Sequence, residues 1–276
     1  MNLNKEIITS RNNPLVKWAA SLQDKKWRDR EGCFIAEGTK LTYEAIEAGL
    51  PIHSLFINEE KKDNILPKLE SVMFNKNCEN FPIHLLSSSA FEKISTEKAP
   101  QGVICVIKSL DFFYNIDIIY NEEFFLDENE KALALCSVRD PGNLGAVIRS
   151  AVAFGVDHIV LTSDCADVYN PKTVRSAMGS LFRTKITTVK NFASFIEAAK
   201  QNGRRVFAAE LTDNAMSLTD AGLSYTDVMI IGNEGHGIPS EISDLCTGSV
   251  YIPISKKTES LNASVAAAIF MWEQNK

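Results

Sequence analysis

The chain has 276 residues, of which 45% are apolar and 23% charged, a composition typical of a soluble globular protein with room for two domains. No apolar stretch is long enough to cross a bilayer and the first residues, MNLNKEIITSRNN, hold no secretion signal, so we expect a cytoplasmic protein without a membrane partner. The net charge of −6 argues against a nucleic-acid partner, but seven acidic residues and no basic one fall within 111–130, which leaves both flanking regions near neutral. The six cysteines form no CxxC pair, so no metal site is expected.

Residues 1–110 predict an alternating α/β domain. Residues 8–32 are expected to form a helix with Asn13 as its N-cap and Pro14 at the first helical position. A further helix is expected at 39–50, and strands at 33–38, 53–58, 81–87 and 102–108. The first 30 residues carry seven basic and three acidic residues around Trp18 and Trp27. Such a mixture suits phosphate contact and base stacking, and an ordinary solvated helix face is an equally good interpretation.

Residues 131–276 predict a mainly parallel sheet with helices on both faces, after an acidic and aromatic connector at 111–130. The aromatic content of the connector favours a packed element over a flexible linker, and its role stays open. Strands are expected at 132–138, 158–162, 185–189, 204–210, 227–233 and 249–254. Helices are expected at 143–154, 170–178, 191–203, 239–246 and 260–273.

Three segments of the second domain place polar or glycine residues at the end of a strand and then begin a helix. They are DPGNLGAVIRSAVAFG (140–155), IIGNEGHGIPSEI (230–242) and YIPISKKTESLNASVAAAIFMWE (251–273). Because loops at the carboxyl ends of parallel strands meet at one edge of the sheet, we expect one composite pocket. In the first segment the helix N-terminus favours an anion, and Arg149 is expected at the same mouth.

Each segment alone has a local interpretation as well. Glu234 can accept hydrogen bonds from its own turn, His236 can be loop packing, and Ser260 or Asn262 can cap the last helix. The alanine-rich face of that helix can pack in the core or against another subunit. None of the segments matches the dinucleotide fingerprint GxGxxG, and no GxxxxGK[ST] phosphate loop is present.

Taken together, the three segments and NPKTVRSAMGSLFR (170–183) resemble the SpoU (TrmH) family of RNA 2′-O-ribose methyltransferases in the SPOUT superfamily. The resemblance is dense over residues 131–276. It is looser over the N-terminal part, which is similar to the family's smaller, ribosomal-protein-like α/β RNA-binding domain. The resemblance implies an α/β fold in which the C-terminal parallel sheet carries a trefoil knot. It also implies S-adenosylmethionine as cofactor, an RNA partner and a homodimer formed through the C-terminal domain.

The resemblance assigns residues to two roles, and the basic stretch suggests a third group. The catalytic group is Asn143, Arg149, Glu234, Ser260 and Asn262. The cofactor-binding group is Ala209, Glu210, Gly232, Ile252 and Leu261. The RNA-binding candidates are Arg11, Lys17, Lys25, Lys26, Arg28 and Arg30. One departure is Lys256, which stands where the family usually has glycine, and its effect on the loop stays open.

The implied reaction is attack of a ribose 2′-hydroxyl on the methyl group of the cofactor. A neutral hydroxyl is a poor nucleophile, so a neighbouring group must take or share its proton. The resemblance implies Arg149 as this base, assisted by an RNA phosphate. Deprotonating a guanidinium at pH 7 costs roughly 7–9 kcal/mol. We therefore favour the hypothesis that Arg149 stays cationic, holds a phosphate and stabilises the developing alkoxide.

Large ribosomal RNA is the favoured substrate, with guanosine as the favoured nucleotide, and transfer RNA is the alternative. A catalytically lapsed RNA-binding protein of the same fold is disfavoured because Arg149, Glu234 and Asn262 are present. A nucleotide-dependent oxidoreductase is disfavoured because the dinucleotide fingerprint is missing.

Overall fold

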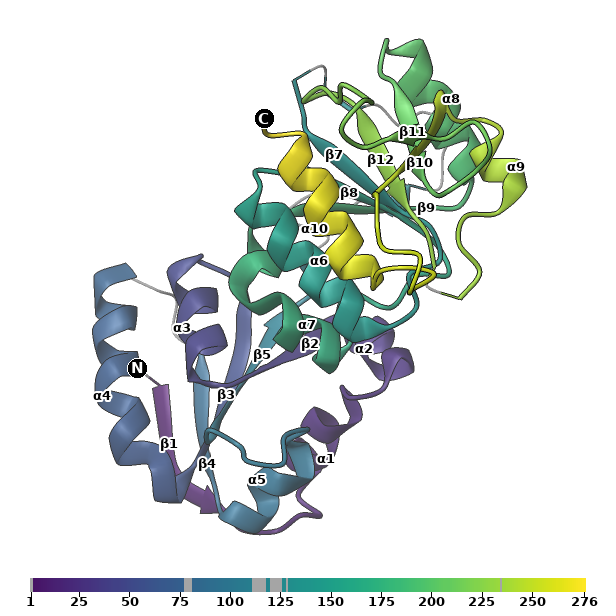
Figure 1. Cartoon of the computed structure of the whole chain (residues 1–276). Helices are drawn as coiled ribbons and strands as arrows, with labels where there is room; N and C mark the ends of the chain where they lie inside the picture. Colours follow the sequence, from purple (N-terminus) through teal and green to yellow (C-terminus); the bar gives the residue numbers. More distant parts are fainter. Residues whose placement is uncertain (1, 77–80, 111–117, 120–125, 128, 234) are drawn as a thin grey trace. The chain divides into compact units, whose positions relative to one another are not determined.

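The computed structural model describes residues 2–76, 81–110, 118–119, 126–127, 129–233 and 235–276 (Figure 1). The chain forms two compact units: Met1–Ser109 with Asp167–Phe182, and Leu110–Ala166 with Arg183–Lys276. The sequence division at 110 and 131 places 167–182 in the second domain, whereas in the structure this segment folds with the first unit. Most of the predicted connector lies outside the described residues, which include only its short strand β6 (Ile118–Ile119) and a few positions near residue 130.

The first unit contains a five-stranded mixed sheet in the order β1-β4-β3-β5-β2. β1, β4 and β3 run parallel, and β5 is antiparallel to both β3 and β2. The strands are β1 (Asn2–Ile8), β2 (Cys33–Glu37), β3 (Ile52–Asn58), β4 (Pro82–Leu86) and β5 (Val103–Lys108). The helices are α1 (Pro14–Ser21), α2 (Lys25–Glu31), α3 (Thr39–Glu47), α4 (Lys62–Lys76) and α5 (Ser88–Ile94), with a 3-10 turn η1 (Glu59–Lys61).

The helix predicted over 8–32 is two helices preceded by a strand. Asn13 caps α1 as expected, because its side chain accepts a hydrogen bond from the backbone N–H of Leu15 at 2.9 Å. A second cap follows at Asp24, which accepts from the backbone N–H of Lys26 at 3.1 Å and starts α2. α2 ends at Gly32, whose positive φ of 58° is the left-handed conformation that glycine favours at a helix end.

Residues 167–182 join the first unit through two contacts with β2 and α2. Tyr169 stacks on the fully buried ring of Phe34 in β2, with ring centroids 4.5 Å apart. Asp167 forms an ion pair with Arg28 of α2, whose side chain is almost completely buried. The segment itself contains α7 (Pro171–Ala177) and a 3-10 turn η3 (Met178–Phe182). Neither contact is visible from local sequence, since both partners lie more than a hundred residues away.

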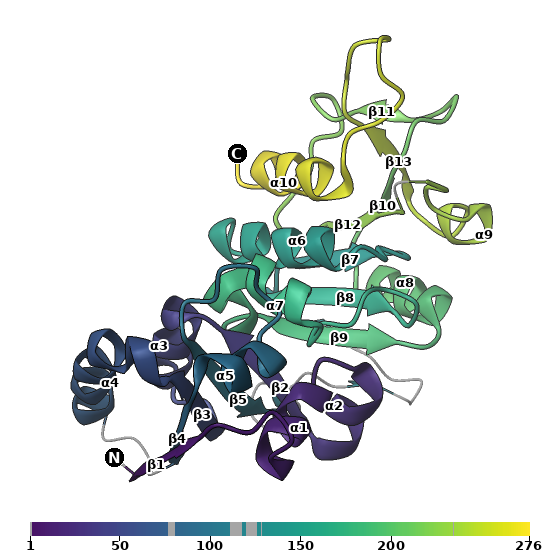
Figure 2. The ribbon, with the colours of Figure 1, turned by 90° about the horizontal axis from the view of Figure 1, so that it is seen from below.

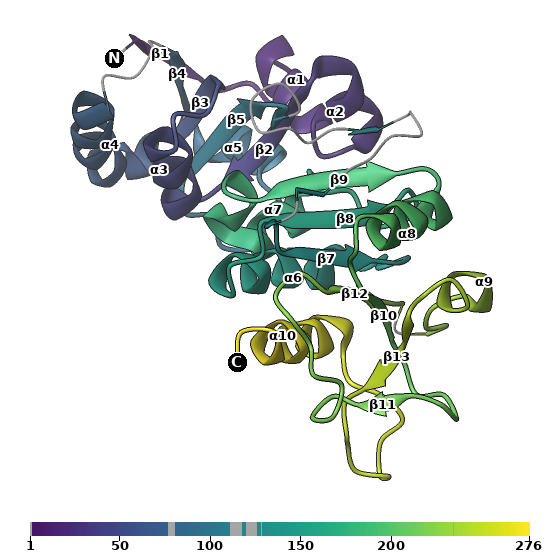
Figure 3. The same ribbon diagram turned by 90° about the horizontal axis from the view of Figure 1, so that it is seen from above.

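The second unit is built on an eight-stranded parallel sheet in the order β11-β13-β10-β12-β7-β8-β9-β6. Figure 3 shows β9, β8, β7 and β12 side by side in this order. The strands besides β6 are β7 (Ala132–Leu135), β8 (His158–Thr162), β9 (Lys185–Val189), β10 (Val206–Ala209), β11 (Met216–Ser217), β12 (Val228–Ile231) and β13 (Gly248–Tyr251). The helices are α6 (Pro141–Ala153), α8 (Phe192–Gln201), α9 (Ser240–Ser243) and α10 (Ala263–Glu273).

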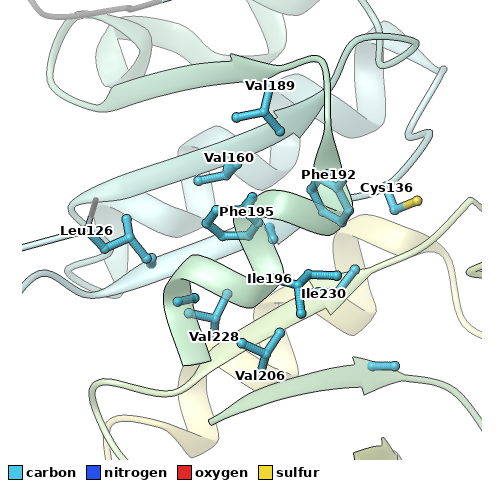
Figure 4. Packing of buried hydrophobic residues seen from close by; sticks show 14 of the residues in the cluster. Leu126, Cys136, Val160, Val189, Phe192, Phe195, Ile196, Val206, Val228 and Ile230 are labelled. Atoms are coloured by element: carbon cyan, nitrogen blue, oxygen red, sulfur yellow. The ribbon is translucent and has the colours of Figure 1, made fainter. Parts of the chain in front are cut away.

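Helices cover the sheet of the second unit because its central strands, β10, β12 and β7, are apolar at every position. On one face α8 inserts Phe192, Phe195 and Ile196 among side chains of alternate strand positions, such as Val160 and Ile230 (Figure 4). The remaining positions point to the opposite face. There α6 and α10 lie side by side (Figure 2). No helix within the described residues is long and apolar enough to cross a membrane.

Candidate active site

The order of the strands changes direction between β7 and β12. From β7 the chain extends the sheet through β8 and β9 on one side, and it later builds β12, β10 and β13 on the other. Such a reversal point in a parallel sheet separates the loops that leave the neighbouring strands, and ligands bind at the carboxyl ends there. Those carboxyl ends carry the three polar segments identified in the sequence.

A cavity of about 720 Å³ opens at these strand ends. Its size lies within the range of small-molecule sites, which is about 300–1,000 Å³. The lining combines apolar side chains with backbone and a few polar groups. It comprises Ala209, Glu210, Leu211, Ile231, Gly232, Asn233, Gly237, Val250, Tyr251, Ile252, Pro253, Ile254, Ser255, Lys256, Thr258, Glu259, Ser260, Leu261, Ala263, Ala266 and Phe270.

All five residues that the resemblance assigns to the cofactor line this one cavity. They are Ala209, Glu210, Gly232, Ile252 and Leu261. They come from three stretches that are far apart in the sequence and meet only because β10, β12 and β13 are neighbours in the sheet. The departing residue Lys256 also lines the cavity, so a cation stands in the wall where the family usually has glycine.

Gly232 begins a tight turn that closes on itself. A Cβ atom at this position would lie 2.6 Å from the carbonyl carbon of Gly237, so no larger residue fits without opening the turn. Asn233 and Gly237 close the turn with two backbone hydrogen bonds of 3.1 and 2.9 Å. Gly237 has a positive φ of 68°, which glycine adopts without strain. The glycines therefore keep this part of the cavity wall as bare backbone.

Asn233 joins this turn to the loop after β7, a role that the sequence did not reveal. Its side-chain amide donates to the backbone carbonyl of Ser137 at 2.8 Å, and its Oδ1 accepts from the backbone N–H of Gly235 at 2.8 Å. Ser137 has a positive φ of 57°, which is unusual for a residue with a side chain. The sequence feature that could have indicated this role is the position of the asparagine, directly after the first glycine of segment 230–242.

Asp164 holds Ser137 in this conformation. Its carboxylate accepts hydrogen bonds from Ser137 Oγ, Arg139 Nη2 and Thr162 Oγ1, each at 2.7 Å. Burial by itself would raise the pKa of Asp164, but the hydrogen bonds from Arg139, Thr162 and Ser137 outweigh it and place the pKa at about 2. The loop after β7 is thus fixed by a carboxylate that is ionised at neutral pH.

The N-terminal ends of α6 and α10 meet beside the cavity. Asn262 caps α10 by accepting from the backbone N–H of Ser264 at 3.0 Å, and its side-chain amide donates to Asn143 Oδ1 at 3.0 Å. Asn143 lies in the first turn of α6, whose cap is Asp140, so this helix begins two residues earlier than predicted. Asn262 therefore caps α10 and also bonds directly to Asn143, so that two of the predicted catalytic residues are in contact. Leu261 and Ala263, on either side of it, line the cavity.

Arg149 does not line the cavity, contrary to the expectation that it points to the same mouth as the helix start. It lies six residues after Asn143 on α6, which turns its side chain by about 120° from that of Asn143. The side chain is exposed and forms no hydrogen bond or ion pair with any residue that the structure describes. Ser260 lines the cavity, and Glu234 lies outside the described residues.

Glu210 contributes a carboxylate to the cavity wall just after β10. Its Oε1 accepts hydrogen bonds from the hydroxyl groups of Ser243 and Ser249, the second at 2.7 Å. Two donors hold this oxygen in place, and the group remains next to the cavity. A fixed carboxylate in a largely apolar wall suits recognition of hydroxyl or amino groups of a ligand.

Five of the six RNA-binding candidates in the first unit have exposed side chains, and the sixth, Arg28, does not. The exposed five are Arg11, Lys17, Lys25, Lys26 and Arg30. The Arg28 guanidinium donates to the backbone carbonyls of Leu22 and Gln23 and pairs with Asp167. The prediction that Arg28 contacts RNA is therefore wrong, because the protein itself uses this cation.

The tryptophans of the basic stretch are also held by the protein. The indole of Trp18 donates to Glu31 at 3.1 Å and lies against the ring of His53, 4.7 Å away. Trp27 is half-buried, and the Arg30 guanidinium lies over its ring at 5.0 Å.

Two family models match the chain. Residues 130–272 match the SpoU rRNA methylase family, and residues 13–105 match the MRM3-like substrate-binding domain. The chain is 30% identical over 268 residues to the 23S rRNA (guanosine(2553)-2′-O)-methyltransferase RlmP of Bacillus subtilis, covering 97% of this chain and 98% of that protein. It is 28% identical to the 23S rRNA (uridine(2479)-2′-O)-methyltransferase of Streptomyces viridochromogenes, covering 96% and 90%.

A solved structure is similar to this chain over both units. The AdoMet-bound rRNA methyltransferase from Sinorhizobium meliloti is 29% identical, with a TM-score of 0.81, covering 98% of this chain and 97% of that one. Family model, relatives and fold agree over almost the full length of both units. The chain belongs to the SpoU rRNA methylase family.

Proposed function

We propose that the protein transfers a methyl group from S-adenosylmethionine to a ribose 2′-hydroxyl of large ribosomal RNA, with guanosine as the favoured nucleotide. Membership of the SpoU family supports the reaction, and two relatives named as 23S rRNA 2′-O-methyltransferases support the substrate. Transfer RNA is the alternative substrate. We propose a cytoplasmic location, where ribosomal RNA is available as a substrate.

The observation that carries the proposal is the convergence of Ala209, Glu210, Gly232, Ile252 and Leu261 on one cavity of about 720 Å³. The residues present fit a nucleoside cofactor: apolar side chains give a surface for a base, and the bare turn at Gly232 leaves backbone groups at the wall. Glu210 offers a fixed acceptor for hydroxyl or amino groups. When bound, S-adenosylmethionine supplies an electrophilic methyl group on a positively charged sulfur. The trefoil knot implied by the family resemblance stays a prediction.

We assign the catalytic steps to Arg149 and the residues at the two helix starts. Asn143 and Asn262, linked at 3.0 Å, present amide groups beside the cavity that can orient the ribose. Ser260, at the cavity lip, and Glu234 complete the group. Arg149 keeps its positive charge, holds the phosphate next to the reacting ribose and stabilises the alkoxide as the proton leaves.

A homodimer formed through the second unit reconciles the position of Arg149 with this role. The Arg149 guanidinium is exposed and does not line the cavity of its own chain, so it is available to the cavity of a second copy. Val265 and Trp272 of α10 are about half exposed and stand seven residues apart on one helix face. An exposed apolar stripe beside the candidate site is typical of a subunit interface.

Ligand-dependent melting tests the cofactor assignment. S-adenosylmethionine or its demethylated product should raise the melting temperature, while NAD should leave it unchanged. Mapping 2′-O-methyl groups in ribosomal and transfer RNA, from cells with and without the protein, tests the reaction and the substrate. The catalytically lapsed alternative would be supported if the cofactor raises the melting temperature but cells without the protein lack no 2′-O-methyl group in either RNA.

Variants of Arg149 separate the two catalytic roles. If Arg149 is a bidentate cation, Arg149→Lys should lose most of its activity at every pH between 6 and 9. Retention of most activity by this variant would contradict the clamp, and a log-linear rise of the wild-type rate with pH would favour deprotonation on the path.

A further inference from the structure

A second hollow, in the first unit, has no role in the site described above. It has a volume of about 540 Å³ and is lined by Arg11, Asn12, Lys17, Ala20, Ser21 and Lys93. Three of the six lining residues are cations and none is an acid. Lys93 comes from α5 and stands 76 residues after Lys17, so the basic stretch of the sequence could not include it.

The three cations are uncompensated. Arg11, Lys17 and Lys93 are exposed, and none of their side chains forms an ion pair or hydrogen bond with another residue in the described part of the chain. In the same unit Arg28 is neutralised by Asp167, and Arg30 lies 3.5 Å from Glu31. Three like charges around one hollow repel one another, a cost that a bound anion would relieve.

A rigid support holds the hollow in shape. Lys17, Ala20 and Ser21 stand on one face of α1, because residues three and four apart are neighbours on a helix. α1 and α5 share one core: Val16, Ala19 and Leu22 are packed in the same buried cluster as Ala90, Phe91 and Ile94. The side chain of Gln23 adds a hydrogen bond of 2.7 Å to the backbone carbonyl of Ile94. The backbone at Lys93 is therefore held at a fixed place relative to α1, and both Lys93 and Lys17 line the hollow.

The lining indicates which part of a nucleic acid fits. No aromatic side chain lines the hollow, so it offers no surface for base stacking, and Trp18 is held by Glu31 and His53. The hydroxyl of Ser21 donates to the backbone carbonyl of Trp18 at 2.6 Å, which leaves Asn12 as the neutral donor. One guanidinium, two ammonium groups and an amide are donors suited to phosphate oxygens.

We propose that this hollow binds the phosphate backbone of the RNA substrate, with Arg11, Lys17 and Lys93 neutralising adjacent phosphates independently of base sequence. The inference rests on the proposed function for the identity of the substrate, and it adds Lys93 and Asn12 to the RNA-binding surface. The hollow fixes the position of the RNA, while nucleotide choice is made elsewhere.

The test measures binding of the full-length protein to deproteinised 23S ribosomal RNA over a salt series. Lys93→Gln should reduce the slope of log K against log salt by about 0.7–0.9, since one phosphate contact is lost. Relative to 1 M salt, this is a loss of roughly five- to eight-fold in affinity at 0.1 M salt. Arg11→Lys should retain the slope, because the charge is kept.

The matched control is Lys40→Gln, which removes a lysine from α3 outside the hollow, 3.9 Å from Glu44. A slope for Lys93→Gln equal to that of Lys40→Gln would overturn the proposal. Methyl transfer is assayed separately: a wild-type protein that binds RNA through the hollow yet methylates none contradicts the proposed function and leaves the phosphate site standing.

Discussion

Lys131 is a fully buried lysine of the second unit and lies at the C-terminal ends of α6 and α10. Its replacement by methionine should weaken the packing of these two helices, which carry residues of the candidate site at their N-terminal ends. Its ammonium group donates to the backbone carbonyls of Phe154 and Met271 at 3.3 and 3.4 Å and to Asn275 Oδ1 at 2.7 Å. Phe154 is the C-cap of α6, and Met271 belongs to the last turn of α10. One cation thus binds the negative ends of two helices whose other ends meet at Asn143 and Asn262.

The magnitude follows from what methionine leaves behind. The stem of the side chain is retained, so little packing is lost. The Phe154 carbonyl keeps a hydrogen bond of 3.1 Å from the Asn275 side chain, and Asn275 is exposed to water. The buried Met271 carbonyl loses the ammonium, which costs about 1–3 kcal/mol, and the helix ends lose a favourable charge worth up to about 2 kcal/mol. Methionine also removes the cost of burying the ammonium, which offsets part of this loss. We therefore expect the free energy of unfolding to fall by about 2–3 kcal/mol.

Thermal and urea unfolding measure this loss, with Lys276→Met as the matched control. A loss of this size lowers the melting temperature of a domain of 150 residues or more by roughly 5–10 °C. Lys276 stands at the same end of α10, but it is exposed and pairs with Glu273 at 2.8 Å, so its replacement should change stability by less than about 0.5 kcal/mol. Because α10 lines the cavity, Lys131→Met should also weaken S-adenosylmethionine binding several-fold.

The reasoning fails if Lys131→Met is as stable as Lys276→Met. The pH dependence gives a second test. Burial lowers the pKa of Lys131 below 10.5, outweighing the attraction of Asp157, so the unfolded chain holds this proton more tightly than the folded protein. Stability of the wild type should therefore rise between that lowered pKa and 10.5, and this rise should be missing in Lys131→Met.

Three further changes test other parts of the structure. Gly232→Ala should reduce cofactor affinity at least ten-fold by calorimetry, because its Cβ meets backbone of the closed turn at 2.6 Å, whereas Gly235→Ala, whose Cβ has 3.4 Å of room, should bind almost normally. Burial would raise the pKa of Glu130, but its hydrogen bond and charge interaction with His158 and the charge of Lys185 outweigh this and lower it to about 2. Stability of about 3 kcal/mol should therefore be present above pH 4.5 and lost as the pH falls towards 2, and urea titrations of Glu130→Gln should show a flatter acid limb. Arg28→Met should destabilise the first unit by about 3–5 kcal/mol in urea unfolding, since it leaves Asp167 without its partner, while RNA affinity per folded molecule stays unchanged.

Local signals in the sequence predict much of the fold. Asn13 and Pro14 start α1 as expected, and the alternation of strands and helices gives the parallel sheet of the second unit. The strand β1 escapes prediction because its sequence, NLNKEII, is largely polar and it pairs along one side only, with β4. Arg28 is misjudged because burial of a guanidinium depends on Asp167, a partner 139 residues away.

The site is predictable only in part for the same reason. Spacing shows that Gly232 belongs to a tight turn, but it does not show that residues 209, 232, 252 and 261 share a cavity. That meeting depends on the strand order, in which β12 separates β10 from β7. The hollow around Lys93 likewise requires α1 and α5 to be packed together.

The return of residues 167–182 to the first unit has a consequence for synthesis of the protein on the ribosome. A nascent chain that ends at residue 109 has made the whole five-stranded sheet, yet it lacks the ring of Tyr169 over Phe34 and the carboxylate for Arg28. At about 5–20 residues per second, the missing segment is made roughly 4–15 s later, after β7, α6 and β8 have been synthesised. The two units must therefore mature together during translation, and a fragment cut at residue 109 should aggregate.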